Sequence, residues 1–379
     1  MKIVLTGSGS GGHFYPLIAV AEAIRKEVAA RKTLEPDLIY IGPTPFDSQA
    51  LLEQDIAYVG TTAGKVRRYF SLLNVFDAFK TLWGIWRSII QLFRLYPDVV
   101  FSTGGYASFP TLFAARLLRI PVILHDSDAH PGMANLFAAP FARHISIAHP
   151  DAINFFPPKT HAKIALLGQP IRTDIESPAP AGGHEFLKLA PDIPTILILG
   201  GSLGAETINN VVLDALPILV QKYNIVHQTG ANHLKEVEGL AHVRLQDTPH
   251  EDRYRAFGLL NALALRMAAG ISSLIIARAG SGTIFEIAAW GIPSILVPIP
   301  AEVSHDQTKN AFSYARSGAA TVMEQRNLSQ HLFVAEIDRI MNDPALRSQM
   351  GQAAKAFARP DAAAKIAHAI IEVALEHSN

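Results

Sequence analysis

The chain has 379 residues, of which 49% are apolar and 17% charged, a balance that excludes a disordered or fibrous protein and suits two domains. Its 33 basic and 33 acidic residues leave no net charge to attract nucleic acid, so no nucleic-acid partner is predicted. Cysteine is absent, which excludes disulfides, thiolate metal sites and a cysteine nucleophile. Without a signal-like leader or a convincing run of roughly 20 apolar residues, membrane contact is predicted to be peripheral.

The first half of the chain alternates short apolar runs with helical patterns, which is typical of a parallel sheet covered by helices on both faces. A helix is predicted over residues 16–27, behind a glycine-rich loop. Strands are predicted at residues 3–5, 37–41, 99–102 and 122–125. Residues 1–175 are therefore expected to form an N-terminal domain.

The second half repeats this order after residues 176–194, whose proline and glycine predict a linker. A domain over residues 195–358 is expected, and residues 359–379 predict a helix that packs back on one domain, with the N-terminal domain as the candidate. The predicted elements of the second domain are strands at 195–199, 225–228, 274–277 and 294–297 and a helix at 205–219. The predicted α/β architecture has two Rossmann-like parallel-sheet domains that face an interdomain cleft.

The first glycine loop carries Ser10, Gly11 and Gly12 and is followed by His13. Glycines let a ligand approach the backbone and a helix N-terminus attracts anions, so these three residues are candidates for phosphate binding, with an ordinary tight turn as the alternative. A nicotinamide oxidoreductase is disfavoured because residues 41–43 offer no acid for a ribose. A turn needs no imidazole, so His13 is a candidate general base.

Two loops of the second domain repeat this anion-binding pattern. Ser202 and Gly204 lie in the turn after the first strand, and Gly280 and Thr283 lie where a later loop opens a helix. Glu286 follows on the first turns of that helix, where an acid is otherwise a simple dipole contact. Two loops and a carboxylate together favour a nucleotide, with the loops on the phosphates and Glu286 on the ribose hydroxyls.

Residues 74–95 carry apolar side chains at helical spacing, among them Trp83 and Trp86. Basic residues such as Arg87 accompany them, against the single acid Asp77. A helix of this kind can lie in a lipid interface. A core helix is the alternative, and both descriptions hold if one flank is buried and the other exposed.

Several stretches carry motifs in a characteristic order: the glycine loop with His13, then residues 104–110, 168–172, 200–205, 278–286 and 305–311. Together they resemble the MurG family of UDP-N-acetylglucosamine transferases, and the resemblance extends over about residues 1–325. The resemblance implies the two-domain GT-B fold, with donor nucleotide in the C-terminal domain and lipid acceptor in the N-terminal one. It implies inverting transfer of N-acetylglucosamine to the undecaprenyl-pyrophosphoryl-muramoyl-peptide (lipid I) of peptidoglycan synthesis, without a metal or cofactor. The expected location is the inner face of the cytoplasmic membrane.

The resemblance also implies roles for single residues. Ser202 contacts the diphosphate, Arg172 lies near it at the domain junction, and Glu286 binds ribose. The uracil contact falls near Ala262, in a segment that lacks the usual acidic pair of the family. The remaining implied contacts are those to the donor sugar, from Asp306 and Gln307. Tyr106 and Ser108, in the motif at residues 104–110, are candidates for acceptor contacts. Trp83, Trp86 and Arg87, from the helical pattern described above, are candidates for membrane contacts.

One motif departs from the family, which usually shows His-Glu-Gln-Asn where this chain has His125-Asp126-Ser127-Asp128. Asp128 puts a carboxylate where a neutral amide is expected, which indicates a shifted sugar or acceptor preference and makes Asp128 a rival of His13 as the base. A metal-binding pair of Asp126 and Asp128 is the alternative. It is disfavoured because the resembling architecture neutralises the diphosphate with helix ends.

Three other functions stay open at this point. A related enzyme could use another UDP-sugar or lipid acceptor, or could epimerise a UDP-sugar. A non-catalytic subunit that binds nucleotide and membrane is the alternative of another class. His13, Glu286 and Gln307 argue against that subunit, because mere nucleotide retention does not need all three.

Overall fold

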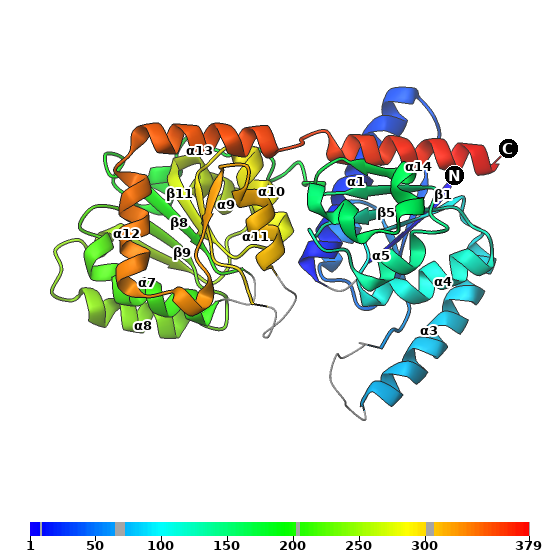
Figure 1. Cartoon of the computed structure of the whole chain (residues 1–379), viewed down its shortest axis with the longest axis horizontal. Helices are drawn as coiled ribbons and strands as arrows, with labels where there is room; N and C mark the ends of the chain where they lie inside the picture. Colours follow the sequence, from blue (N-terminus) through cyan, green and yellow to red (C-terminus); the bar gives the residue numbers. More distant parts are fainter. Residues whose placement is uncertain (8–9, 65–72, 202–204, 301–306, 379) are drawn as a thin grey trace. The chain divides into compact units, whose positions relative to one another are not determined.

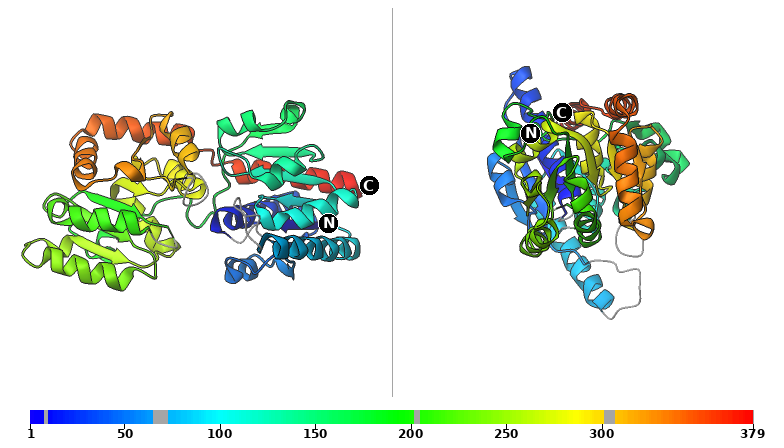
Figure 2. Two further views of the ribbon diagram at one scale, coloured as in Figure 1. Left: turned by 60° about the horizontal axis from the view of Figure 1, so that its bottom comes forward. Right: turned by 90° about the vertical axis from the view of Figure 1, so that its left-hand side faces the viewer.

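The computed structural model describes residues 1–7, 10–64, 73–201, 205–300 and 307–378. It divides into two compact units, Met1–Thr173 with Arg359–Asn379, and Asp174–Ala358. Each unit is a parallel sheet with helices on both faces, which confirms the predicted fold class (Figures 1 and 2). The chain passes from the first unit to the second and then returns to the first.

The sheet of the first unit has the strand order β3-β2-β1-β4-β5-β6-β7, with all described pairings parallel. Alternate side chains of β1 enter opposite cores, Ile3 and Leu5 on one face and Val4 on the other. The strands are β1 (Lys2–Thr6), β2 (Asp37–Gly42), β3 (Ala57–Gly60), β4 (Val99–Ser102), β5 (Val122–Asp126), β6 (His144–Ile147) and β7 (Ile164–Leu166).

Helices cover both faces of this sheet. The core that contains Ile3 also contains side chains of α1 (Gly11–Arg31) and α14 (Ala362–Ser378). The core around Val4 contains side chains of the helices on the other face. These and the remaining helices are α2 (Ser48–Glu53), α3 (Leu73–Leu95), α4 (Phe109–Leu117) and α5 (Met133–Ala138), with 3₁₀ turns at Tyr106–Ser108, Pro150–Phe155 and Pro158–Lys163.

Helix α1 begins at Gly11, five residues before the predicted start at residue 16. The carbonyl of Ser10 accepts hydrogen bonds from the backbone N–H groups of His13 (3.1 Å) and Phe14 (3.0 Å). Two glycines and a histidine therefore form the first turn, although glycine weakens a helix interior. The predicted loop residues Gly11, Gly12 and His13 lie on the helix end itself.

The second unit has the strand order β10-β9-β8-β11-β12-β13, with all described pairings parallel. Its strands are β8 (Thr195–Leu199), β9 (Asn224–Gln228), β10 (Tyr254–Phe257), β11 (Ser272–Ala277), β12 (Ser294–Leu296) and β13 (Ala320–Val322). Its helices are α6 (Gly183–Leu187), α7 (Glu206–Leu219), α8 (Leu234–Leu245), α9 (Ala262–Ile271), α10 (Ser281–Trp290), α11 (Thr308–Ala315), α12 (Gln330–Met341) and α13 (Pro344–Phe357), with 3₁₀ turns at Glu251–Arg253 and Gln325–Asn327.

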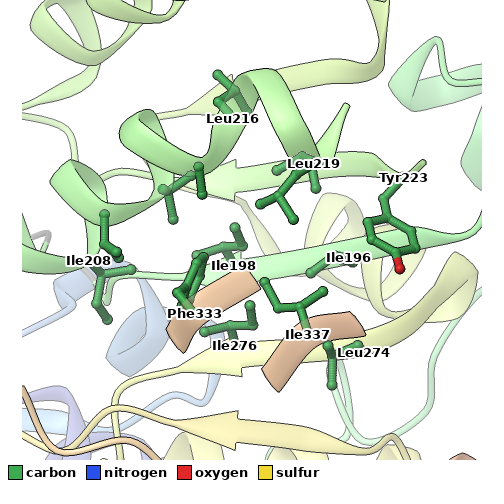
Figure 3. Packing of buried hydrophobic residues seen from close by; sticks show 14 of the residues in the cluster. Ile196, Ile198, Ile208, Leu216, Leu219, Tyr223, Leu274, Ile276, Phe333 and Ile337 are labelled. Carbon is green, nitrogen blue, oxygen red and sulfur yellow. The ribbon is translucent and has the colours of Figure 1, made fainter. Parts of the chain in front are cut away.

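A single hydrophobic cluster fills the space between this sheet and the helices on one face. Figure 3 shows Ile196 and Ile198 of β8 between side chains of α7 and α12. Phe333 and Ile337 of α12 are fully buried there, so α12 is fixed to the sheet by aliphatic and aromatic packing.

Both sheets have a topological switch point. The chain builds outward on one side from β1 and then on the other side from β4, and in the second unit it does the same from β8 and β11. In open parallel sheets, ligands bind at the carboxyl ends of the strands beside such a point. The loops after β1, β4, β8 and β11 are therefore where a site is expected.

Helix α14 belongs to the first unit although it follows the second one in the chain. Its Ile366, Ile370 and Ile371 are buried in the core under α1. On the rim of this contact, Arg31 donates to the Glu372 carboxylate (2.7 Å) and His368 lies 2.8 Å from the Glu27 carboxylate. Half-exposed ion pairs of this kind contribute little, so the packing of α14 is chiefly hydrophobic.

Ile370→Ala is expected to lower the stability of the first unit by about 2–5 kcal/mol, because it leaves a cavity at a side chain with no exposed surface. The measurement is hydrogen exchange of the β1 amides, which reports on the first unit alone. Leu375→Ala on the same helix is the control, since that side chain is 42% exposed. Equal protection of β1 in both variants would show that α14 does not support the sheet.

Candidate functional site

The loops after β1 and β4 are joined at the switch point of the first unit. His13 Nδ1 donates to the carbonyl oxygen of Thr103 (2.9 Å), and Thr103 Oγ1 donates to the carbonyl oxygen of His13 (2.6 Å). A Cβ on Gly7 would lie 2.5 Å from Thr103 Oγ1, so the two loops touch closely. Because a carbonyl only accepts, Nδ1 carries the proton and Nε2 of the neutral ring carries the lone pair. This is the tautomer that a general base needs at Nε2.

Ser10, Gly11 and Gly12 surround the start of α1 in the first unit, beside His13. Ser10 and Gly12 are exposed, and a Cβ on Gly12 would meet nothing within 4 Å. The backbone N–H groups of this first helical turn can therefore be approached by an anion or a hydroxyl.

The carboxyl end of β5 carries the departing motif, and Asp126 closes a loop there. Asp126 Oδ1 accepts from the Asp128 backbone N–H (3.2 Å), and Oδ2 accepts from the Gly132 N–H (3.2 Å) and from Asn135 Nδ2 (2.8 Å). Burial raises the pKa of the Asp126 carboxyl to about 7, against the lowering by the Asn135 hydrogen bond. Asp126 is thus engaged inside its own loop, unlike one half of an open metal-binding pair. Asp128 itself is half-buried.

His125 is fully buried beneath this loop. Its Nε2 donates to Gln169 Oε1 (2.9 Å), and its Nδ1 lies 3.0 Å from Ser146 Oγ. Burial lowers the pKa of His125 to about 4, with a smaller contribution from the nearby His13 in the same direction. His125 is therefore a neutral brace that ties β5 to β6 and to the segment after β7.

The loop after β4 makes a turn that only glycines fit, since Gly104 and Gly105 have φ of +83° and +81°. A Cβ on Gly104 would also lie 2.8 Å from Asn135 Nδ2, so this turn packs against the loop of Asp126. Ser108 is buried and its hydroxyl donates to the Gly105 carbonyl (2.8 Å), which shapes the turn. Tyr106 is 37% exposed beside it.

Two residues of α1 hold the segment that contains Arg172. The guanidinium carbon of Arg172 lies 4.1 Å from the centre of the Tyr15 ring, a close cation–π contact. The next residue, Thr173, donates from its backbone N–H and its hydroxyl to Glu22 Oε2, both at 3.0 Å. Arg172 is therefore held near the start of α1.

In the second unit, α7 and α10 both begin at the switch point, after β8 and β11. Their N-cap residues are Ala205 and Gly280, neither of which has a side-chain acceptor for the first N–H groups. Such helix ends suit a diphosphate. Gly201, after β8, has φ of +81°, and the next residues in the chain, which include Ser202 and Gly204, lie outside the described residues.

Thr283 and Glu286 lie on the first two turns of α10, and their side chains, like that of Gln307, are half-buried. Gln307 Oε1 accepts from the Ile299 backbone N–H (3.2 Å), and its Nε2 would lie 3.7 Å from a Cβ on Gly280. The loop after β12 thus reaches the N-terminus of α10. Asp306 lies outside the described residues.

Ala262 is the first residue of α9, after the loop that follows β10. The N-cap Asn261 accepts from the Ala264 backbone N–H through Oδ1 (2.9 Å). Leu259 and Leu263, on either side, are 62% and 52% exposed. Two exposed leucines therefore lie near Ala262, one before it in the chain and one after it.

Helix α3 presents large apolar side chains to solvent along one flank. Trp83 is 59% exposed and Trp86 58%, which rules out the core alternative for these two side chains. The other flank is packed, because a Cβ on Gly84 would overlap the Thr62 carbonyl and Ser88 is buried. The other exposed side chains of this helix are Phe76, Phe79, Leu82 and Phe93, together with the basic Lys80, Arg87 and Arg94. Within the described part of the chain, no helix is long and apolar enough to cross a bilayer.

Sequence reasoning missed four residues that organise these loops: Thr103, Gln169, Tyr15 and Asn135. Thr103 directly precedes the glycine motif at residues 104–110, and Gln169 lies in the motif at residues 168–172, so these motifs could have drawn attention to both residues. Tyr15 and Asn135 lie on helices and carry no local signal, because their partners are 157 and 9 residues away along the chain.

Sequence models of two protein-family domains match this chain. The glycosyltransferase family 28 N-terminal domain matches residues 3–147 and the glycosyltransferase family 28 C-terminal domain matches residues 195–366. These two matches together cover most of the chain and show that it is a family 28 glycosyltransferase.

Curated relatives narrow this class. An enzyme of Clostridium novyi is 35% identical over 90% of this chain and 91% of its own length, and one of Treponema denticola is 31% identical over 88% and 86%. Both are named UDP-N-acetylglucosamine–N-acetylmuramyl-(pentapeptide) pyrophosphoryl-undecaprenol N-acetylglucosamine transferase. The crystal structure of Acinetobacter baumannii MurG superposes with a TM-score of 0.73 at 26% identity, over 98% of this chain and 99% of that one. The chain belongs to the MurG family of GT-B glycosyltransferases.

The buried His125 is expected to make stability depend on pH. The unfolded chain takes up a proton on this histidine near pH 6.5, whereas the folded chain resists protonation down to about 4. The contribution of the neutral His125 to the unfolding free energy is therefore fully present above pH 6.5 and is lost as the pH is lowered toward 4. When the pH is lowered from 7.5 to 5.0, the unfolding free energy of the wild type should drop by about 2 kcal/mol more than that of His125→Gln. Urea unfolding at both pH values measures this, with the exposed His331→Gln as control, and an identical loss in His125→Gln and wild type would contradict it.

Proposed function

We propose that this chain transfers N-acetylglucosamine from UDP-N-acetylglucosamine to the undecaprenyl-pyrophosphoryl-muramoyl-peptide in peptidoglycan synthesis, and so serves cell-wall growth, cell shape and division. The observation that carries the proposal is the 35% identity over nine-tenths of the chain to an enzyme of that name. The two helix N-termini without side-chain caps at one switch point support it, because they suit the diphosphate of a nucleotide sugar.

The proposed donor site lies at the carboxyl edge of the second sheet. The starts of α7 and α10 bind the diphosphate, with Ser202 and Gly204 in one turn and Gly280 and Thr283 in the other. Glu286 accepts from the ribose hydroxyls, because a carboxylate offers strong charge-assisted acceptors. The other proposed donor contacts are Ala262 to the base, Asp306 and Gln307 to the sugar, and Arg172, Ser10, Gly11 and Gly12 from the first unit.

The proposed reaction is a single displacement. His13 Nε2 takes the proton of the acceptor hydroxyl, whose oxygen forms a bond to the anomeric carbon of the sugar. The bond from that carbon to the diphosphate oxygen breaks on the opposite face, so the configuration inverts, and UDP keeps the bonding electrons. Helix N-termini and Arg172 stabilise this developing negative charge.

His13 is preferred to Asp128 as the base for a geometric reason. The bond from Nδ1 to the Thr103 carbonyl fixes both the tautomer and the direction of the ring, as a base requires. Asp128 is instead proposed to tune acceptor or sugar preference, together with Tyr106 and Ser108. Its loop is held in place by Asp126.

We further propose that the exposed flank of α3 lies in the surface of the cytoplasmic membrane, on the inner face. Trp83 and Trp86 would enter the interface, and Arg87 with Lys80 and Arg94 would face anionic headgroups. This placement supports access to an acceptor whose lipid stays in the bilayer.

The function is tested by incubating the protein with a panel of radiolabelled UDP-sugars and the lipid-linked muramoyl-peptide. Transfer of label from UDP-N-acetylglucosamine to the lipid is expected. Transfer from another UDP-sugar would assign a different donor, and formation of UDP-N-acetylmannosamine without acceptor would assign an epimerase.

His13→Asn is expected to lower turnover by about 10²–10⁴-fold, because it removes the base. An asparagine amide can still donate to the Thr103 carbonyl, so the loop, the melting temperature and UDP affinity should stay near wild type. Asp128→Asn, which restores the amide usual in the family, is the companion variant and should keep its turnover within about tenfold. Wild-type turnover in His13→Asn, with loss in Asp128→Asn, would move the base to Asp128.

Trp83→Ala combined with Trp86→Ala is expected to weaken binding to anionic phospholipid vesicles about tenfold or more, because two large apolar side chains no longer enter the lipid. Vesicle sedimentation measures it. Leu240→Ala with Val243→Ala, on the exposed flank of α8, is the matched control. Equal vesicle binding by the two double variants would place the membrane contact elsewhere.

A further inference from the structure

Gln228, the last residue of β9, bonds to the loops on both sides of its strand. Strand β9 lies between β8 and β10 in the sheet. The main-chain carbonyl of Gln228 accepts from the backbone N–H of Gly200, after β8 (3.0 Å). Its side-chain Oε1 accepts from the backbone N–H of Leu260, after β10 (3.0 Å). One residue, 7% exposed, thus supports two loops of the edge where a nucleotide is proposed.

The attachment on the β8 side is rigid. A Cβ on Gly200 would lie 2.9 Å from the Gln228 carbonyl oxygen, so the turn is pressed against the end of β9. The neighbouring Thr229 carbonyl accepts from Asn209 Nδ2 on the first turns of α7 (3.1 Å). His227 Nε2 donates to Asn209 Oδ1 (3.1 Å), and burial keeps that ring neutral by lowering the pKa of His227 to about 3. Main-chain atoms and a buried amide therefore fix the start of α7.

The attachment on the β10 side runs through the Gln228 side chain. Leu260 precedes Asn261, the N-cap of α9, and Ala262, its first residue. The Gln228 acceptor for the Leu260 N–H therefore holds the residue directly before the N-cap of α9 in place. A buried N–H without an acceptor costs about 1–3 kcal/mol, enough to displace such a loop.

The two loops differ in the chemistry they offer to a ligand. The loop after β8 leads into an uncapped helix end that suits phosphate. The loop after β10 is flanked by the exposed Leu259 and Leu263, which suit the face of a nucleobase. With β9 between them, the loops are two strand spacings apart, roughly 10 Å. A ligand that touches both must be extended, with a charged end and a flat apolar end, as a nucleoside diphosphate is.

We propose that Gln228 is a positioning residue for base selectivity: its side-chain carbonyl holds the loop of Leu260 at a set distance from the phosphate loop. This inference rests on the proposed function, since it takes UDP as the nucleotide. Gln228 does not touch the ligand in this scheme. Phosphate binding depends on its main-chain carbonyl, which every substitution keeps, and base recognition depends on its side chain.

The test compares UDP and ADP binding by calorimetry in the wild type and in Gln228→Met, which keeps the length of the side chain and removes the acceptor. UDP affinity should fall about tenfold while ADP affinity changes less than twofold, so the preference for UDP shrinks. Gln228→Glu keeps an acceptor oxygen for Leu260. Its added charge should weaken both nucleotides alike and leave the UDP preference near that of the wild type.

Thr229→Val is the matched control, because it removes a buried hydroxyl at the same strand end without removing an acceptor from either loop. Its melting temperature should fall, with the UDP preference unchanged. Equal weakening of UDP and ADP in Gln228→Met, or an unchanged UDP preference, would overturn the positioning role. If Gln228→Met does not fold, loss of the UDP preference in Gln228→Glu would overturn it. A wild type that does not prefer UDP would instead overturn the proposed donor.

Discussion

Parallel pairing of the strands is the constraint on which both units depend. When neighbouring strands all run the same way, every strand ends at one edge, and each connection must return over a face of the sheet. The returning helices bury both faces, so the strands are mostly apolar and the chemistry is left chiefly to the strand ends and the loops. For this reason His13, Thr103 and Asp126 lie at the carboxyl edge of the first unit's sheet. Gly200, Gly280 and Gln307 lie at the carboxyl edge of the second unit's sheet.

At each of these edges a buried, uncharged histidine braces the loops. His125 bonds Gln169 in the first unit, and His227 bonds Asn209 in the second. In both cases burial favours the neutral ring, because a charged imidazolium would lose its hydration. A neutral hydrogen-bonded ring fixes a loop without adding charge beside a site that is proposed to bind a diphosphate.

The sequence predicted the central strands and the positions of the glycine turns, because long apolar runs next to glycine are strong local signals. It missed β3, β6, β7, β10 and β13, each of which has only three or four residues and so gives a weak apolar signal. Periodicity also could not say whether the apolar flank of α3 is buried or exposed, since a core helix and an interfacial helix share the same spacing of apolar residues. The exposure of Trp83 follows from Gly84, whose close approach to Thr62 turns the tryptophan away. Similarly, Asp126 and Asp128 look equivalent as a pair, and the backbone donors around Asp126 distinguish them.

The return of the chain to the first unit has a consequence for how the protein is made. The core under α1 contains Ile366 and Ile370, which follow the whole second unit in the chain. On the ribosome, β1 and α1 emerge first and wait with an open apolar face until more than 180 further residues of the second unit have been synthesised. The second unit is contiguous and can close its own core earlier. The unit that begins first is therefore completed last, and during synthesis its uncovered α1 face is where a chaperone would bind.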